Sequence, residues 1–108
     1  MTISDLAEIL RVVLVERDAD ELLRAFAHPA RREIVRRCWA APVSAGELSD
    51  ALGLAPASTS EHLKVLRKTG LVVLTKDGTY RRYRTDPARL AAVVEWLAAF
   101  PNHAPPSR

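Results

Sequence analysis

The apolar residues at the start of this chain recur at spacings of three and four, which is the period of an amphipathic helix. The pattern predicts a helix over residues 4–17 whose apolar face consists of Leu6, Ile9, Leu10, Val13 and Leu14. A second helical piece is predicted over residues 20–27. Pro29 follows it, and because proline disfavours a helical residue before it, the helix is expected to stop at His28.

A third helix is predicted to begin at Pro29 and to run to Trp39, since proline suits the first turn of a helix. Its expected core face comprises Ile34, Val35, Cys38 and Trp39. On the same reasoning His28 is interpreted as a turn or capping residue rather than a ligand. Cys38 is interpreted as a buried structural thiol, because the sequence offers no resolving cysteine for a redox switch.

Two short helices separated by a tight turn are predicted between residues 44 and 69. Ser44 and Glu47 form a capping-box pattern at the start of the first, and Gly53 is suited to the left-handed position that ends it. The residues expected to face inward from the first helix are Leu48, Ala51 and Leu52. The second helix, over residues 56–69, begins at a proline and is expected to bury Thr59, Leu63 and Leu66.

A β-hairpin and a final helix follow. The strands are predicted over residues 71–75 and 80–85, joined by a turn at 76–79 that contains the hairpin signal Asp77-Gly78. Tyr83 is the expected inward aromatic residue. Asp86 is predicted to cap a last helix from Pro87, with the apolar stripe Leu90, Val93, Val94, Leu97 and Phe100.

Two helices around a tight turn followed by a hairpin are typical of a winged helix-turn-helix, a shape that fits a DNA groove. We therefore expect a mainly α fold with a small β-hairpin and with helical dimerisation elements at both ends. A single domain is expected over residues 1–101, with a flexible tail over 102–108. The early apolar stripe leaves two possibilities open, a dimer surface or packing onto the domain's own core.

The distribution of charge supports a polyanionic partner. The net charge is only +3, but residues 1–21 hold six acidic residues against two arginines, whereas residues 62–85 hold seven basic residues against one aspartate. An ordinary solvated surface is the alternative. No apolar run approaches the ~20 residues of a membrane span. The acidic start of the chain is unlike a secretory signal, so a cytoplasmic protein is expected.

The start of the helix over 56–69 is the predicted base-reading surface, because recognition helices contact bases with their N-terminal residues. The candidate DNA-contacting residues are Pro56, Ala57, Ser58, Ser60, Glu61, Lys64, Arg67, Lys68, Lys76, Arg81 and Arg82. Arg67 and Lys68 are interpreted as phosphate anchors, and the hairpin arginines as contacts to the backbone or minor groove. Glu61 either accepts from cytosine N4 or, as we favour, interacts with the helix dipole in the first turn.

Four segments together resemble the ArsR-type (arsenic-repressor-like) winged-helix transcriptional regulators: F-A-H-P-A-R-R-E-I-V, G-E-L-S-D-A-L-G-L, S-T-S-E-H-L-K-V-L-R-K-T-G-L-V and D-G-T-Y-R-R-Y-R. The resemblance implies a homodimer that represses a nearby operon, with Ser60 among the base contacts. It also implies that the first and last helices form the dimer, for which the candidate residues are Leu6, Leu10, Val13, Leu90, Val94 and Leu97.

The positions that bind metals in sensing members of that family are not matched by this chain. Where arsenic and cadmium sensors have Cys-x-Cys, this sequence has Ser44-Ala45-Gly46. Zinc-binding members have an Asp-x-His pair on the last helix, and here Asp86 is followed by Ala88. The resemblance therefore points to the metal-independent subgroup, often autorepressors, and no metal or cofactor is expected.

Two other functions remain open from the sequence. One is a winged-helix module that binds an acidic protein partner, and the other is a regulator whose dimer interface holds a small apolar effector. His62 is interpreted as a packing residue of the helix over 56–69, with direct DNA contact as the alternative. No nucleophile–base pair or paired-acid arrangement indicates an enzyme.

Overall fold

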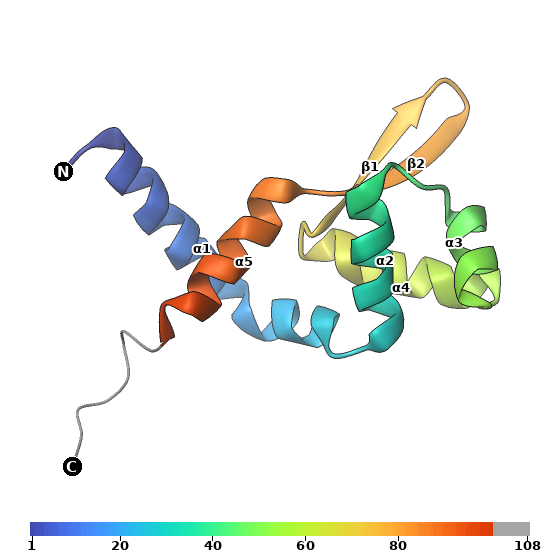
Figure 1. The fold of residues 1–108 in the computed structure, drawn as a ribbon, viewed down its shortest axis with the longest axis horizontal. Coiled ribbons are helices and arrows are strands. Elements are labelled where there is room, and N and C mark those ends of the chain that lie inside the picture. Colours follow the sequence, from blue (N-terminus) through green and yellow to red (C-terminus); the bar gives the residue numbers. More distant parts are fainter. Residues whose placement is uncertain (101–108) are drawn as a thin grey trace, which may run out of the picture.

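The computed structural model describes residues 1–100, except for the side chain of Val12. Within them, helices and one antiparallel hairpin follow the order α1 (Ile3–Phe26), α2 (Pro29–Ala40), α3 (Ala45–Leu52), α4 (Pro56–Lys68), β1 (Val72–Asp77), β2 (Tyr80–Thr85) and α5 (Pro87–Ala98) (Figure 1). This arrangement confirms the predicted winged helix-turn-helix. The tail predicted over 102–108 lies outside the described residues.

Helix α1 is one continuous helix of 24 residues, so the predicted break between residues 17 and 20 is wrong. Asp18 and Asp20 are poor helix formers, but the packing of Val15, Ala19 and Leu22 against the core carries the helix across them. A capping box that the sequence reading missed starts the helix: the Thr2 hydroxyl accepts from the Asp5 N–H, and the Asp5 carboxylate accepts from the Thr2 N–H.

The apolar stripe predicted for the start of α1 faces away from the domain. Leu10 is 60% exposed, and Leu6 and Val13 are each 48% exposed. The alternative that this stripe packs on the domain's own core is therefore wrong, because α1 uses a different set of residues, Val15, Ala19, Leu22 and Ala25, for that packing. Figure 1 shows the first half of α1 extending beyond the rest of the fold, with α5 crossing the helix near its middle.

The core joins α2 to every other element of the helix-turn-helix. Ile34, Val35 and Cys38 of α2 are buried as predicted, and Leu48 and Leu66 are fully buried with them. Trp39 is 56% exposed, so its assignment to the core is wrong. It follows the buried Cys38 in the last turn of α2, so the core face there is one residue narrower than the periodicity predicts.

The helix-turn-helix interface contains a buried hydroxyl pair. Ser49 Oγ donates to Thr59 Oγ1 at 2.7 Å, and Thr59 Oγ1 in turn approaches the Ala55 carbonyl at 3.4 Å. Ala51, which was predicted to face inward, is exposed. Ser49 is the residue of α3 that is buried in the interface, where its hydroxyl has a hydrogen-bond partner. Between the helices, Gly53 has φ of 66°, the left-handed conformation predicted for it.

Strand β2 has the predicted bounds, whereas β1 starts one residue later than predicted and ends two residues later, at Asp77. Gly78 has φ of 62° and forms the two-residue loop with Thr79. The hairpin is fixed to the helices at Tyr83, whose N–H donates to the Val43 carbonyl at 2.7 Å and whose carbonyl accepts from the Val43 N–H at 2.9 Å. These bonds determine where the wing stands beside α4.

Polar contacts connect α5 to α1 and to the end of α4. Asp86 caps α5 as predicted, accepting from the Ala88 and Arg89 N–H groups. Arg89 donates from Nε to the Thr69 carbonyl at 2.9 Å and from Nη2 to Asp18 at 2.8 Å. Trp96 donates to Glu16 at 2.6 Å. Among residues 1–100, no helix combines the length and apolar character that crossing a bilayer requires.

Two histidines meet where the α1–α2 turn packs against α4. His28 caps α2 as predicted, its Nδ1 accepting from the Ala30 N–H at 3.1 Å. The His28 and His62 rings lie 4.5 Å apart, and Arg31 Nη1 lies 3.4 Å from His62 Nδ1. Burial lowers the pKa of His62, and the nearby His28 and Arg31 lower it further. His62 thus has the packing role that the sequence predicted.

We expect the buried hydroxyl pair to be energetically coupled. Thr59→Val leaves the buried Ser49 hydroxyl without an acceptor and should lower the free energy of unfolding by about 1–3 kcal/mol. Ser49→Ala should cost less, because Thr59 keeps its approach to the Ala55 carbonyl. Urea unfolding of both variants and of the double variant measures the coupling. Exposed Ser58→Ala is the matched control, and additive single effects would contradict the pairing.

We also expect stability to fall in mild acid because of His62. A depressed pKa in the folded state means that the unfolded chain binds the proton first, so this contribution is fully present above pH 6.5 and is lost as the pH falls through the lower folded-state pKa. Urea unfolding at several pH values should show a smaller loss for His62→Gln than for the original chain. His28→Asn, which retains a capping side chain, should also reduce the loss; identical pH profiles would refute the assignment.

Candidate nucleic-acid interface

Helix α4 buries one face completely and presents the opposite face to solvent. Thr59, Leu63 and Leu66 face the core as predicted. The outer side of the helix is formed by Ser60, Lys64 and Arg67. These residues are spaced by four and three positions, so they lie on one face of the helix, opposite the inward residues. This separation of the two faces makes the outer stripe of α4 a continuous polar surface.

Every residue predicted to contact DNA is exposed. On α4 these are Pro56, Ala57, Ser58, Ser60, Glu61, Lys64, Arg67 and Lys68, and on the hairpin they are Lys76, Arg81 and Arg82. The first turn of α4 contains no acidic residue, so the first-turn role favoured for Glu61 is wrong. Counting from Pro56, Glu61 falls in the second turn, which is beyond the N–H groups that a dipole contact uses.

Basic residues occupy both faces of the hairpin. Lys76 lies directly opposite Arg81 across the strands. Because side chains alternate along a strand, these two share a face with Tyr83, whereas Arg82 lies on the other face with Arg84. Like charges directly opposite each other destabilise a hairpin, so the Lys76–Arg81 pair is costly unless an anion approaches it.

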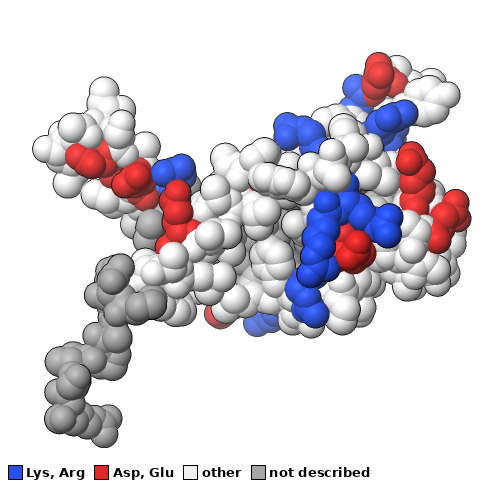
Figure 2. All heavy atoms as spheres, viewed as in Figure 1, with Lys and Arg blue, Asp and Glu red and all other residues white. Residues whose placement is uncertain are grey.

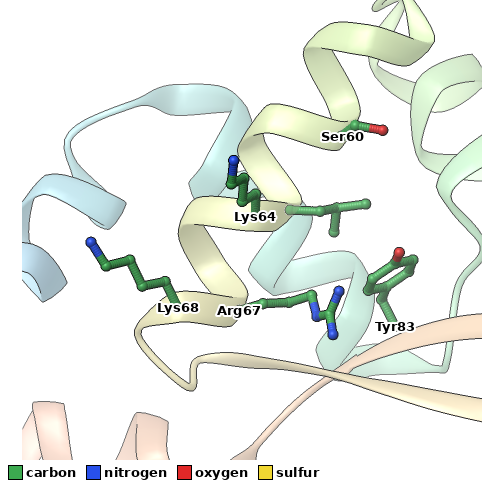
Figure 3. A pocket seen from close by; sticks show the side chains of 6 residues that line it. Ser60, Lys64, Arg67, Lys68 and Tyr83 are labelled. Atoms are coloured by element: carbon green, nitrogen blue, oxygen red, sulfur yellow. The ribbon is translucent and has the colours of Figure 1, made fainter.

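A groove of about 570 Å³ separates α4 from the hairpin. Its lining consists of Ser60, Leu63, Lys64, Arg67, Lys68 and Tyr83. In Figure 3 the Arg67 and Tyr83 side chains lie toward one another across the groove, and Lys68 points away from them. None of the described residues that line the groove is acidic, so the groove favours an anion.

The basic residues of the described chain divide into paired and unpaired groups. The basic residues that form ion pairs are Arg11, Arg36, Arg37, Lys68 and Arg89. Within residues 1–100, none of the six other basic residues of α4 and the hairpin has an ion-pair partner; they are Lys64, Arg67, Lys76, Arg81, Arg82 and Arg84. Arg17 and Arg24 of α1 and Arg31 and Arg32 of α2 also lack an ion-pair partner among residues 1–100. Of the six on α4 and the hairpin, Lys64 and Arg67 line the groove.

Lys68 differs from the other predicted anchors. Its Nζ lies 3.2 Å from Glu21 of α1, so the side chain links the two helices. It still lines part of the groove, but it points away from Arg67 and Tyr83 (Figure 3). The acidic residues of α1 are thus partly used in contacts within the domain. On the face shown in Figure 2, acidic residues also gather along the projecting end of α1, away from the hairpin.

The positions that hold metals in sensing relatives are already engaged. The Ser44 hydroxyl accepts from the Glu47 N–H at 3.1 Å, one half of the predicted capping box, and Asp86 caps α5. Within the described part of the chain, no three His, Cys, Asp or Glu residues gather into a metal-binding group. Cys38 is buried, and burial raises the pKa of its thiol to about 11.

A second, smaller pocket lies between α1 and α5. Its volume is about 230 Å³, below the ~300–1,000 Å³ typical of small-molecule sites. Its surface is mostly apolar, with Leu14, Ala88 and Ala92 lining it beside Arg11, Asp86 and Arg89. A small apolar effector at the dimer interface stays a prediction.

Sequence reasoning missed the part that Tyr83 plays in the groove. The sequence predicted Tyr83 only as an inward aromatic residue, and Tyr83 does pack on the core. The available signal was its position two residues after Arg81, which places both side chains on the same face of the hairpin. The orientation of that face toward α4 depends on the Val43 contact, which no local pattern indicates.

Known proteins resemble the chain in sequence and in fold. Residues 26–75 match a family model described as a helix-turn-helix domain. The HTH-type transcriptional regulator Rv2034 of Mycobacterium tuberculosis is 40% identical over 84 residues, covering 78% of each chain. The HTH-type transcriptional repressor SmtB of the same species is 38% identical over 76 residues, covering 70% of this chain and 56% of that protein.

A solved structure shows the same architecture. An ArsR-like transcriptional regulator from Rhodococcus sp. RHA1 superposes with a TM-score of 0.73 at 26% identity, covering 95% of this chain and 85% of that one. Its fold likeness extends beyond the helix-turn-helix segment to nearly the whole chain. Together with the sequence relatives, it shows that the chain belongs to the ArsR/SmtB family of transcriptional regulators with a helix-turn-helix DNA-binding domain.

Proposed function

We propose that this protein is a dimeric, sequence-specific transcriptional repressor that binds an inverted-repeat operator in the cytoplasm. The observation that carries the proposal is the set of six basic residues on α4 and the hairpin, none of which has an ion-pair partner among residues 1–100. Such a surface releases counterions when it meets a phosphate backbone, and this supplies affinity without sequence information. The relative SmtB is a transcriptional repressor, which supports this direction of regulation.

The two ends of the surface have different roles in this proposal. The small exposed residues at the start of α4, with Ser60 beside them, let the helix approach base edges closely. Glu61 follows Ser60 in the second turn of α4. In this proposal its carboxylate accepts a hydrogen bond from a cytosine N4 group rather than contacting phosphate. Lys64, Arg67 and the hairpin arginines hold the backbone, whereas the ion pair of Lys68 with Glu21 reduces its contribution.

The exposed stripes of α1 and α5 support the homodimer. Besides the α1 stripe, Val94 is 57% exposed and Leu97 is 46% exposed, whereas Leu90 is half-buried on the core. Contiguous apolar surface of this kind marks an interaction site. A two-fold dimer built on it would place two α4 helices about one helical turn, ~34 Å, apart on the duplex.

Metal independence is also part of the proposal. It is supported by the absence of thiolates at positions 44–46 and by the use of Asp86 as a helix cap. Repression should therefore respond to self-association and DNA affinity rather than to a metal. Binding to the operator in the presence of EDTA and of added zinc tests this, because equal affinities are expected.

Titration of duplex DNA at several salt concentrations tests the function itself. With ~6–10 phosphate contacts per dimer, affinity should fall by about 10³–10⁵-fold between 50 and 200 mM salt. A reporter gene behind the bound upstream region should be expressed less when the protein is present. Micromolar binding without salt dependence, or a rise in reporter expression, would contradict the repressor.

Substitutions should separate backbone contacts from base reading. Arg81→Ala and Arg82→Ala should weaken binding to operator and random duplex by a similar factor, each lowering the salt slope by about 1 per protomer. Ser60→Ala should instead change the preference among sequences. Arg36→Ala, an exposed arginine already paired with Glu33 on α2, is the control. A loss of specificity from the hairpin variants equal to that from Ser60→Ala would refute this division.

The dimer surface should be sensitive to charge. Leu10→Asp and Leu97→Asp place a carboxylate on the exposed stripes and should convert the protein to a monomer of 11.9 kDa by light scattering. Because both positions are solvent-exposed in the single chain, the far-UV circular dichroism should be retained. A folded dimer in both variants would place the interface elsewhere.

A further inference from the structure

The Tyr83 hydroxyl is an unused hydrogen-bond donor in the middle of the basic groove. Tyr83 lines the groove together with Ser60 and Arg67. No residue among 1–100 forms a hydrogen bond with the Tyr83 hydroxyl. Its oxygen is also not one of the buried polar atoms without a partner, so it is exposed to solvent. The oxygen is therefore accessible from the groove and free to bind a ligand.

The tyrosine is held more firmly than its neighbours in the groove. Its backbone pairs with Leu74 on one side and with Val43 on the other. Its ring packs against the hydrophobic core and is half-buried. A ring with two side-chain torsions that is fixed in this way loses little conformational entropy when its hydroxyl makes a contact.

The groups around this hydroxyl are all suited to one oxyanion. Arg67 extends toward Tyr83 from α4 (Figure 3). A guanidinium and a phenolic hydroxyl offer hydrogen-bond donors, and none of the described residues that line the groove has a carboxylate to oppose an anion. Arg67 has no ion-pair partner among the described residues.

We propose that Tyr83 and Arg67 form a phosphate-binding notch that holds one backbone phosphate of the DNA between α4 and the hairpin. The proposal rests on the DNA-binding function above and deepens it. Tyr83 donates its phenolic hydrogen to a non-bridging phosphate oxygen, and Arg67 supplies the charge. The notch positions the recognition helix relative to the wing, since one phosphate is contacted from both elements.

Tyr83→Phe tests the notch because it removes only the oxygen and leaves the packed ring in place. Affinity for operator and for random duplex should fall by a similar factor, roughly tenfold, because a phosphate contact carries no sequence information. The salt slope should stay unchanged, since tyrosine is neutral, whereas Arg67→Ala should lower it by about 1 per protomer. The midpoint of thermal unfolding should match the original protein.

Tyr80→Phe is the matched control. This substitution also removes a phenolic oxygen from β2, but Tyr80 is 68% exposed and lies on the opposite face of the hairpin from Tyr83. Its affinity should be unchanged. Equal affinities of Tyr83→Phe and the original protein, with Arg67→Ala still weakened, would overturn the notch and leave the proposed function standing. A failure of the original protein to bind any duplex would instead overturn both.

Neutral methylphosphonate substitutions in the duplex identify the contacted phosphate. One position in each half-site should weaken the original protein strongly. At that position the combined loss with Tyr83→Phe should be smaller than the sum of the separate losses, because both changes remove the same contact. Additive losses at every position of the half-site would overturn the inference.

Discussion

The orientation of the polar outer face of α4 depends on the complete burial of the opposite face of this helix. Thr59, Leu63 and Leu66 are at most 2% exposed, and the Ser49–Thr59 hydroxyl pair fixes α3 against the same face. A helix held in this way cannot rotate about its axis without exposing leucines and breaking a buried hydrogen bond. The orientation of Ser60, Lys64 and Arg67 toward solvent follows from that constraint, as does the basic character of the groove.

Contacts between residues far apart in sequence fix the hairpin and the terminal helices in place. Val43 fixes the hairpin at Tyr83, and Arg89 connects α5 with both Asp18 of α1 and the end of α4 at Thr69. The exposed apolar stripes and the basic groove are thus parts of one packed unit. A dimer formed through α1 and α5 would set the distance between two grooves through these same contacts.

Local patterns were sufficient for most of the fold. Proline at helix starts, Gly53 in the turn, the Asp77–Gly78 step and the periodicity of α4 each act over a few residues, and each element appears where the sequence placed it. The errors arose where tertiary contacts decide. Packing of Val15 and Ala19 carries α1 through two aspartates, and the core ends before Trp39 although the helical period continues. Tyr83 was recognised as packed, but its place in the groove depends on Val43, forty residues away.

We propose that the outer face of α4 and the hairpin form one DNA-binding surface. Amide chemical-shift changes on adding a duplex to isotope-labelled protein test this residue by residue. The largest changes should fall at residues 56–67 and 76–84, including the backbone of Tyr83, with small changes along the exposed face of α2. Changes concentrated on α2 or on the stripes of α1 and α5, with α4 and the hairpin unaffected, would contradict the account.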